Sequence, residues 1–571
     1  MPGAHSGRSH VTLTPDADSP VNALAARFWE GILETSPTLA TFYGDDRWAG
    51  DLEDTTAHGR AVVRALMERT AAEAAAIPVD GLSTEDRITR DMLQVVAELQ
   101  VEEDDQGFHQ LKSVDQMSGP QQLLPWLTQF QPADTPERFE AFVERLHAYP
   151  AYLAGHIETL AEGRSTGLTA PRIVVERTIA QIERMLDVPL ESAIVPAMVK
   201  VASDADRERV RDIVRDVVQP ADIAFLDALK GEYLAASRED PGLWSAPDGE
   251  SLYRTAIRSW TSLDLDPNEV HAIGLAQLDA IELERREIAR AAGFGEDTAA
   301  YRAALGEDAG NTPRTKDELV ARANEDIERA MALAPLYFGV LPRALCEVRP
   351  VEEYKEKDAP FAYYYPPSPD GTRDGIYYAN GYDLPSRKFS KLASTTYHEA
   401  APGHHFQITL EMENPHLNTF RRLGSRTVGG AYAEGWGLYS ERLADEMGLY
   451  RNEGERFGML DAQAWRAGRL VVDTGLHALR WPRQRSIDFL RMAGLSETDA
   501  VIETDRYICW PGQALTYMIG QLEIQRLRAE LSARDGSRFD LRAFHDAVLG
   551  HGSLPLATLA RELPTWVATP V

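Results

Sequence analysis

Amphipathic helical patterning runs through most of the 571 residues, and it limits the fold more strongly than any other feature of the sequence. Apolar residues recur every three or four positions in stretches such as 56–76 and 137–163, which are rich in Ala, Leu, Glu and Arg. A third stretch begins with a capping signal at Asp266 and Pro267 and stops at Gly293. The sequence therefore predicts a mainly α protein.

The helical pattern is interrupted between residues 360 and 386. Two aromatic-rich runs flank a turn of Pro, Asp and Gly residues there, which is typical of a small β-hairpin. The residues most expected to face a substrate are Tyr363, Tyr364, Tyr365, Tyr377, Tyr378 and Asn380. Because side chains alternate along a strand, only about half of them can do so.

The segment "TYHEAAPGHHFQ", residues 396–407, follows the hairpin and begins like the zinc-binding motif H-E-x-x-H. In that motif the two histidines lie one helical turn apart and bind one metal ion. Here position 402 is proline, and the next histidines are His404 and His405. The segment is therefore either a metal site on a distorted helix or no metal site.

A distortion inside the motif would bring a later histidine back to the face of His398. On a regular helix, a residue six positions on lies about 120° away, and one seven positions on lies ~10.5 Å along the axis. Pro402 lacks the N–H that would bond to the His398 carbonyl, and Gly403 tolerates unusual dihedral angles. We expect the helix to bulge or break, which favours His404 over His405 as the second ligand but leaves both open.

The third ligand is expected on a second helical stretch, which begins at Gly430, 31 residues after Glu399. Glu434 on this stretch would complete a His₂Glu site of the hydrolytic zinc type. Glu441, seven residues later on the same face, is the candidate for an outer hydrogen-bond acceptor. A lone His-Glu pair is usually part of a solvated helix face, but the combined features favour a bound Zn²⁺ or a similar divalent ion.

Four segments carry a resemblance to a known family: "HEAAPGHHFQ", "YAEGWGLYSERLADEMG", "GRLVVDTGLHALRW" and "ICWPGQALTYMIGQLEI". Together they resemble the bacterial family called domain of unknown function 885, a set of metallopeptidase-like proteins, over most of residues 250–550. That family is similar to the gluzincin peptidases, which include angiotensin-converting enzyme, thimet oligopeptidase and bacterial carboxypeptidases of the same shape. The resemblance implies a large two-lobed helical protein with a central cleft and the hairpin next to the metal site.

The resemblance also assigns roles to residues. It implies that His398, His404 and Glu434 bind the metal, and that Glu399 is the general base that takes a proton from the activated water. The gluzincin motif is H-E-x-x-H, so this sequence departs from it by two extra residues. Dipeptidyl peptidase three tolerates one extra residue there, so an insertion does not by itself abolish zinc binding.

Hydrogen-bond donors for an oxyanion come from a tyrosine and a histidine on a later helix in the resembling enzymes. By position in the sequence, the candidates here are His477 and Tyr517. Each has a plain alternative, since Tyr517 could pack in the core and His477 could lie on the surface.

The length of the chain exceeds the usual size of one compact domain. A stretch rich in Pro, Gly and Asp at 238–253 suggests a crossing between lobes. We expect a flexible N-terminus over 1–20, a helical lobe over 21–245 and a catalytic helical lobe over 246–571. The two lobes are expected to form one intertwined unit.

Composition excludes several classes of partner. The net charge of −30 disfavours binding to nucleic acid or to anionic membrane surfaces. Two cysteines, Cys346 and Cys509, are too few for a disulfide scaffold. The first thirty residues contain no apolar run of signal-peptide length, and no later stretch has the ~20 apolar residues of a membrane span. These features predict a cytoplasmic protein and leave its oligomeric state open.

The predicted function is zinc-dependent hydrolysis of amide bonds in short peptides, with an exposed hairpin edge pairing with the substrate backbone. Two alternatives remain open: a metallohydrolase recruited to a small-molecule amide in a biosynthetic pathway, and a non-catalytic helical scaffold. Serine or cysteine hydrolysis has no support, because there is no G-x-S-x-G elbow and neither cysteine has a recognisable nucleophile setting.

Overall fold

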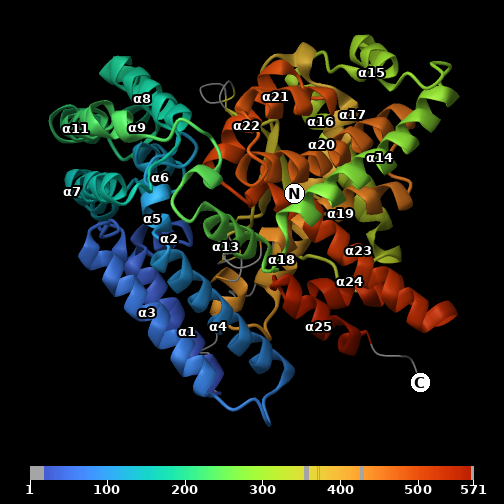
Figure 1. Ribbon diagram of the computed structural model, residues 1–571, viewed down its shortest axis with the longest axis horizontal. Helices are drawn as coiled ribbons and strands as arrows, with labels where there is room; N and C mark the ends of the chain where they lie inside the picture. Colours follow the sequence, from blue (N-terminus) through green and yellow to red (C-terminus); the bar gives the residue numbers. More distant parts are fainter. Residues whose placement is uncertain are drawn as a thin grey trace, which may run out of the picture.

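The computed structural model describes residues 19–352, 356, 359–369, 371, 373–424 and 430–567. Helices make up most of these residues, which confirms the predicted mainly α fold. Figure 1 shows the first helices in blue at the lower left, α7, α8, α9 and α11 above them, and the helices of the C-terminal half on the right. Most of the predicted flexible segment 1–20 lies outside the described residues.

The first half of the chain contains the following helices. They are α1 (Pro20–Thr35), α2 (Pro37–Phe42), α3 (Ala57–Ala76), α4 (Thr84–Asp105), α5 (Phe108–Leu111), α6 (Leu123–Leu127), α7 (Pro136–Thr166), α8 (Arg172–Asp187), α9 (Ile194–Met198), α10 (Asp204–Ile213), α11 (Gln219–Ala228), α12 (Leu234–Ala236) and α13 (Gly249–Thr261).

The second half begins with three helices, continues through a small sheet and ends with a run of helices. The helices are α14 (Pro267–Ala291), α15 (Thr298–Glu307), α16 (Lys316–Leu333), α17 (Phe389–Glu399), α18 (His404–Glu413), α19 (Gly430–Glu446), α20 (Glu453–His477), α21 (Arg483–Met492), α22 (Glu497–Cys509), α23 (Thr516–Asp535), α24 (Leu541–Leu549) and α25 (Leu556–Trp566). The strands among the described residues are β1 (Pro132–Ala133), β2 (Lys200–Val201), β3 (Cys346–Pro350), β4 (Ala362–Tyr365) and β5 (Gly375–Ala379).

The ends of the helices follow the capping signals in the sequence. The Asp266 side chain accepts hydrogen bonds from the N–H groups of Asn268 and Glu269 and so begins α14 at Pro267. The same helix ends at Ala291, and Gly293 follows it with a φ of +88°, a conformation that favours glycine. The predicted start and stop of this helix are confirmed.

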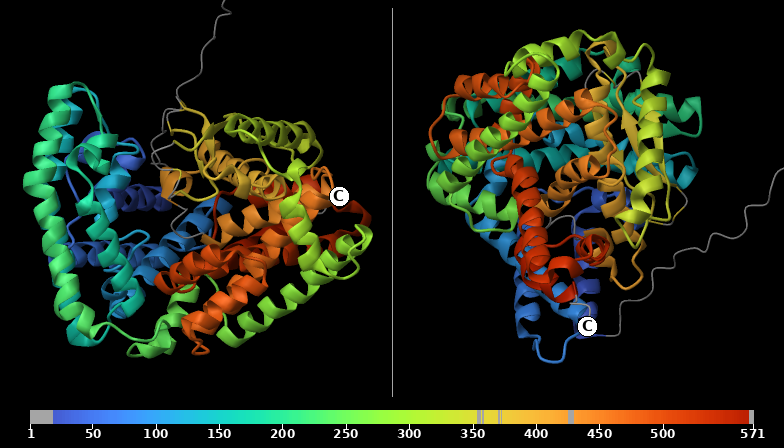
Figure 2. Two further views of the ribbon diagram at one scale, coloured as in Figure 1. Left: turned by 90° about the horizontal axis from the view of Figure 1, so that it is seen from above. Right: turned by 90° about the vertical axis from the view of Figure 1, so that its right-hand side faces the viewer.

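Two large hydrophobic clusters form the core. One joins α1, α3 and α4 to most helices of the C-terminal half, and the other joins the segment 114–233 to residues of α20, α21 and α22. Helix α20 contributes to both, since Leu470 belongs to the first cluster and Val471 to the second. In the left view of Figure 2, the teal to mid-green helices lie on one side and the lime-green to red helices on the other. The predicted lobe boundary near residue 245 stays a prediction.

The predicted hairpin is confirmed as strands β4 and β5, which pair antiparallel with Tyr364 opposite Tyr377. Strand β3 was not predicted, and it pairs parallel to β5, so that β5 is central and β4 lies at an edge. Helices α16 and α17 pack against this sheet. The hydroxyl of Tyr364 lies 2.8 Å from Nδ1 of His405, which places the sheet directly beside the histidine motif.

The tyrosines of the hairpin divide between the two faces of the sheet, as alternation predicts. Tyr364 and Tyr377 lie on the face of α17 and α18, where the Tyr377 hydroxyl is 3.3 Å from Oγ1 of Thr396. The other three tyrosines pack together on the opposite face. The expectation for Asn380 was wrong, because its buried amide donates to backbone carbonyls at 356, 359 and 360 and closes the loop before β4.

The sheet contacts the first half of the chain through the hydroxyl of Tyr365, which donates to Oε1 of Gln129 over 2.9 Å. Within the described ranges, none of the helices combines the length and the apolar composition that a bilayer crossing requires.

Candidate metal centre

The histidine motif breaks the helix where the sequence predicts. Helix α17 ends at Glu399, the chain turns through residues 400–403, and α18 begins at His404. A Cβ atom on Gly403 would lie 1.8 Å from the carbonyl oxygen of His398, so no other residue fits at this turn. The break returns His404 to the neighbourhood of His398, and their ring centroids are 4.8 Å apart.

Helix α19 holds this turn in place through two residues that the sequence analysis missed. The indole N–H of Trp436 donates to the carbonyl of Pro402 over 3.0 Å. A Cβ atom on Gly437 would lie 2.8 Å from Cε1 and Nε2 of His398, so the absence of a side chain leaves room for the imidazole. The signal in the sequence was the run "EGWG", which puts a large ring and a glycine next to Glu434.

Three predicted ligands converge on one point. Oε2 of Glu434 lies 3.5 Å from Nε2 of His398 and 3.5 Å from Nε2 of His404. These distances are long for hydrogen bonds. Ligand bonds of 2.0–2.1 Å at tetrahedral angles, however, separate two ligand atoms by about 3.3–3.4 Å. The spacing and the chemistry of this donor set therefore fit a zinc-type ion.

Glu441 occupies the outer position that the sequence predicts. Its Oε1 lies 2.9 Å from Nδ1 of His398, and its Oε2 accepts a 2.8 Å hydrogen bond from the Ser394 hydroxyl. The Glu441 side chain is fully buried. A carboxylate that accepts the Nδ1 proton leaves Nε2, on the side of Glu434, free to bind a metal ion, which is the arrangement common behind metal-binding histidines.

Glu399 completes the cluster. One of its carboxylate oxygens and one ring nitrogen each of His398 and His404 lie within 4.8 Å of one another, so Glu399 could itself contribute a ligand atom beside Glu434. Burial raises the pKa of the Glu399 carboxyl, and the charges of the two histidines oppose that rise. The side chain is nevertheless partly open to solvent, so it can exchange a proton with water at the cluster.

The charges within the cluster favour a cation at its centre. Burial lowers the pKa of His398, but the carboxylates of Glu434 and Glu441 outweigh it and raise that pKa to about 10. Burial likewise raises the pKa of Glu434, but the two histidines outweigh it and hold that pKa well below its ordinary value. The carboxylates of Glu434 and Glu441 thus make the surroundings of the two imidazoles negative, which favours a bound cation.

His405 forms contacts away from the cluster, which leaves His404 as the candidate second ligand. Its Nδ1 lies 2.8 Å from the hydroxyl of Tyr364, and its Nε2 lies 3.1 Å from the carbonyl of Ala344. Burial lowers its pKa to about 4, so the ring is neutral. The geometry therefore brings His404, and not His405, to the candidate centre.

The two predicted oxyanion donors have different outcomes. The ring of Tyr517 stacks near His398, with centroids 6.2 Å apart and planes 26° apart, so this tyrosine lies beside the cluster. The expectation for His477 was wrong. Its Nδ1 accepts the N–H of Leu243 over 3.2 Å, and its Nε2 lies 3.0 Å from the carbonyl of Tyr507. Both nitrogens are bound to backbone in the core, so His477 has no N–H to offer a substrate.

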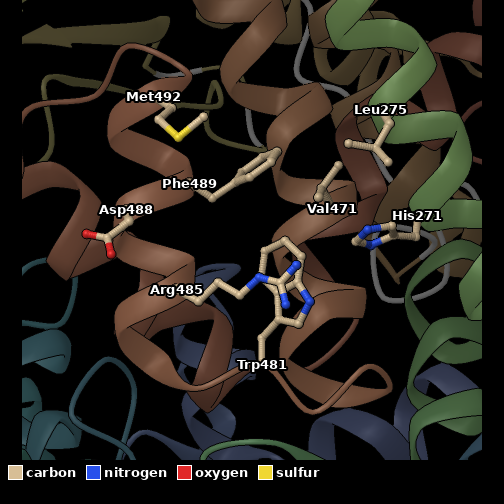
Figure 3. A pocket seen from close by; sticks show the side chains of 8 residues that line it. All are labelled: His271, Leu275, Val471, Trp481, Arg485, Asp488, Phe489 and Met492. Carbon is tan, nitrogen blue, oxygen red and sulfur yellow. The ribbon is translucent and has the colours of Figure 1, made fainter.

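A separate pocket of about 420 Å³ lies between α14, α20 and α21 (Figure 3). It is lined by His271, Leu275, Val471, Trp481, Arg485, Asp488, Phe489 and Met492. The one histidine of the lining, His271, already has a hydrogen-bond partner, since its Nδ1 lies 2.8 Å from Oγ1 of Thr474. This mostly apolar lining contains no set of converging ligands, so the chemistry favours the histidine cluster as the functional site.

A family model described as "Bacterial protein of unknown function (DUF885)" matches residues 37–563, a range that includes the whole candidate centre. The chain belongs to the DUF885 family. Membership confirms the first part of the resemblance seen in the sequence, whereas the likeness to gluzincins remains a prediction. No curated protein matches the chain.

Two solved structures share the fold of this DUF885 protein. One, from Colwellia psychrerythraea, is 28% identical, has a TM-score of 0.89, and the match covers 96% of this chain and 99% of that one. The other, from Shewanella oneidensis, is 18% identical, has a TM-score of 0.75, and the match covers 95% of this chain and 99% of that one. Both are named putative lipoproteins, and the second is described as of unknown function. The cytoplasmic location of this chain stays a prediction.

Proposed function

We propose that this protein is a zinc-dependent hydrolase that cleaves amide bonds in short peptides or small peptide-like compounds. The observation that carries the proposal is the spacing of 3.5 Å from Oε2 of Glu434 to Nε2 of both His398 and His404. Glu441 behind His398 supports it, because an ordinary surface cluster has no need of a fully buried carboxylate that orients one imidazole.

The residues around this site suit amide hydrolysis. When bound, a zinc ion supplies Lewis acidity, which polarises a carbonyl group and makes water more acidic. Glu399, within 4.8 Å of both histidines, is the proposed general base, which accepts a proton from the attacking water and passes it to the departing amine. The ring of Tyr517 stacks near His398, and its hydroxyl is the proposed hydrogen-bond donor to the oxyanion.

The likeness to gluzincins forms part of the proposal. Their motif places the second histidine four positions after the first, whereas here it follows six positions later. The turn at residues 400–403 takes up the two extra residues and begins a new helix at His404. The proposed ligand set is therefore His₂Glu despite the longer spacing.

The sheet beside the motif supports a peptide-like substrate. Strand β4 lies at the edge of its sheet, and its Tyr364 touches His405 of the motif. An extended backbone can pair with such an edge largely independently of its side chains. Peptides of a few residues and compact amides of similar size are the proposed substrates. Hydrolysis of a folded protein at the rate of short peptides would contradict this size limit.

Glu399→Gln tests the proposed chemistry. The amide keeps the shape of the side chain but cannot accept a proton, so zinc content should persist while turnover of short peptides falls by several orders of magnitude. Glu446→Gln on the surface of α19 is the matched control and should keep normal turnover. Near-normal turnover in Glu399→Gln would remove the general base. A zinc-loaded wild type that cleaves neither peptides nor small amides would indicate a non-catalytic scaffold.

A further inference from the structure

Three arginines from two helices surround the ring of Tyr517. Arg466 and Arg469 lie on α20, with guanidinium carbons 5.8 Å and 4.3 Å from the ring centroid. Arg506 lies on α22, with Nη2 3.5 Å from the Tyr517 hydroxyl. Because this ring also stacks near His398, the three guanidinium groups, here called the arginine cluster, lie one aromatic ring away from the candidate metal centre.

The arginine cluster carries more positive charge than its surroundings neutralise. Within the part of the chain that the structure describes, its ion pairs end on a single carboxylate, Glu503, at 3.1 Å from Arg469 and 3.6 Å from Arg506. Arg466 has no ion pair among these residues, and its hydrogen bond to the carbonyl of Ala462 is 3.5 Å long. Three cations against one anion is unexpected in a chain with a net charge of −30.

Each of the three arginines also has a buried nitrogen without a hydrogen-bond partner among the described residues. These atoms are Nε of Arg466, Nη1 of Arg469 and Nε of Arg506. The Arg469 side chain is only 2% exposed, so water cannot readily accept a hydrogen bond from its unpaired nitrogen. An unpaired buried donor on a charged group is costly, and an anionic ligand would remove that cost.

The positive charge extends along the wall of the site through Lys391. This residue is exposed on α17, seven positions before His398, and therefore on the same helix face about 10.5 Å away. The pKa of Lys391 is lowered because protein atoms surround its ammonium group; the charge of Asp499 opposes this fall, and the charge of Arg466 adds to it. Arg466 is therefore close enough to Lys391 for their charges to interact.

We propose that the arginine cluster binds the free carboxylate of the substrate, so that the enzyme removes residues from the carboxyl end of short peptides instead of cutting internally. Guanidinium groups bind carboxylates through paired hydrogen bonds. An extended residue spans about 3.3–3.6 Å, so a carboxylate one or two residues beyond the cleaved bond reaches a cluster one ring away from His398. This inference rests on the proposed hydrolase function and specifies its substrate class.

Binding to a non-hydrolysing variant tests the inference without relying on turnover. Full-length, zinc-loaded Glu399→Gln is titrated calorimetrically with an N-acetylated tripeptide acid and with the same tripeptide as its C-terminal amide. The acid should bind at least tenfold more tightly. Adding Arg466→Gln should abolish this preference, and Arg466→Lys should restore part of it. Arg442→Gln on α19, whose partner Glu284 is 2.8 Å away, is the control and should retain the preference.

The outcomes separate this inference from the proposed function. Equal affinity for the acid and the amide in Glu399→Gln overturns the carboxylate site, whatever the fate of the Arg466 variants. A preference that survives Arg466→Gln in a folded protein places the anion site elsewhere and also overturns it. Selective binding of the acid together with no hydrolysis by the wild type refutes the hydrolase and leaves the anion site standing. Rapid hydrolysis of the amide at the rate of the acid keeps the hydrolase and refutes the inference.

Discussion

Replacing Glu441 by glutamine tests how the candidate metal centre is oriented. The carboxylate lies 2.9 Å from Nδ1 of His398 and 2.8 Å from the Ser394 hydroxyl, and both contacts are buried. Glutamine has nearly the same shape, and its amide oxygen can still accept the Nδ1 proton. The substitution therefore removes the charge of the acceptor and little else.

The size of the effect follows from this exchange. A buried hydrogen bond to a charged group contributes about 1.5–3 kcal/mol, against about 0.5–1.5 kcal/mol for a neutral pair. The difference of about 1–2 kcal/mol corresponds to a ~5- to 30-fold weaker zinc affinity, close to the range seen for outer partners of metal ligands. Competition with a chromogenic chelator measures this affinity directly.

A matched variant shows whether a loss of zinc affinity comes from the orientation of His398 or from general damage to α19. Glu446→Gln lies on the same helix, but its carboxylate pairs with Arg528 at the surface, so zinc affinity should stay at the wild-type value. Thermal unfolding of both variants checks that the fold is kept. A zinc dissociation constant for Glu441→Gln within twofold of wild type would show that the orienting role of Glu441 is wrong.

Two further predictions concern space and charge. Gly437→Ala places a methyl group 2.8 Å from the His398 imidazole, which Glu441 holds from the other side, so zinc affinity should fall at least tenfold. Gly468→Ala is the control, because its added carbon would meet nothing nearer than 3.7 Å, and it should bind zinc normally. Equal zinc affinities in the two variants would contradict the packing argument. Burial raises the pKa of Asp222 to about 7, so the folded state holds its proton more tightly than the unfolded chain, and stability falls as the pH rises from about 4 to 7. The free energy of unfolding changes by about 1.4 kcal/mol per pH unit, so between pH 5 and 7 the stability of Asp222→Asn should rise by about 2–3 kcal/mol relative to that of the wild type. Urea unfolding measures this difference, and parallel pH profiles of stability for the two proteins would refute it.

The parts of the fold that the sequence predicted are those governed by local signals. Asp266 and Gly293 set the ends of α14 because capping depends on neighbouring residues alone. The break at Pro402 and Gly403 was predictable for the same reason, since a missing N–H and a missing Cβ act within one helical turn. Glu441 was predicted from helical spacing once Glu434 had been chosen.

The parts that could not be predicted depend on contacts between distant segments. His477 has the sequence setting of a catalytic histidine, but its partners are Leu243 and Tyr507, which no local pattern connects to it. The arginine cluster looks like ordinary surface charge on α20 and α22, and only the packing of α23 brings Tyr517 between it and His398. Strand β3 was missed because a short parallel strand needs its distant partner to be recognised.

The metal content of the purified chain tests the central claim most directly. Wild-type protein and Glu434→Ala are exposed to excess zinc, dialysed, and compared by elemental analysis at equal protein concentration. We predict about one zinc ion per chain in the wild type and almost none in Glu434→Ala, because two histidines alone hold zinc weakly. A wild type that retains no zinc, or a Glu434→Ala variant that retains as much as the wild type, would contradict the proposed centre.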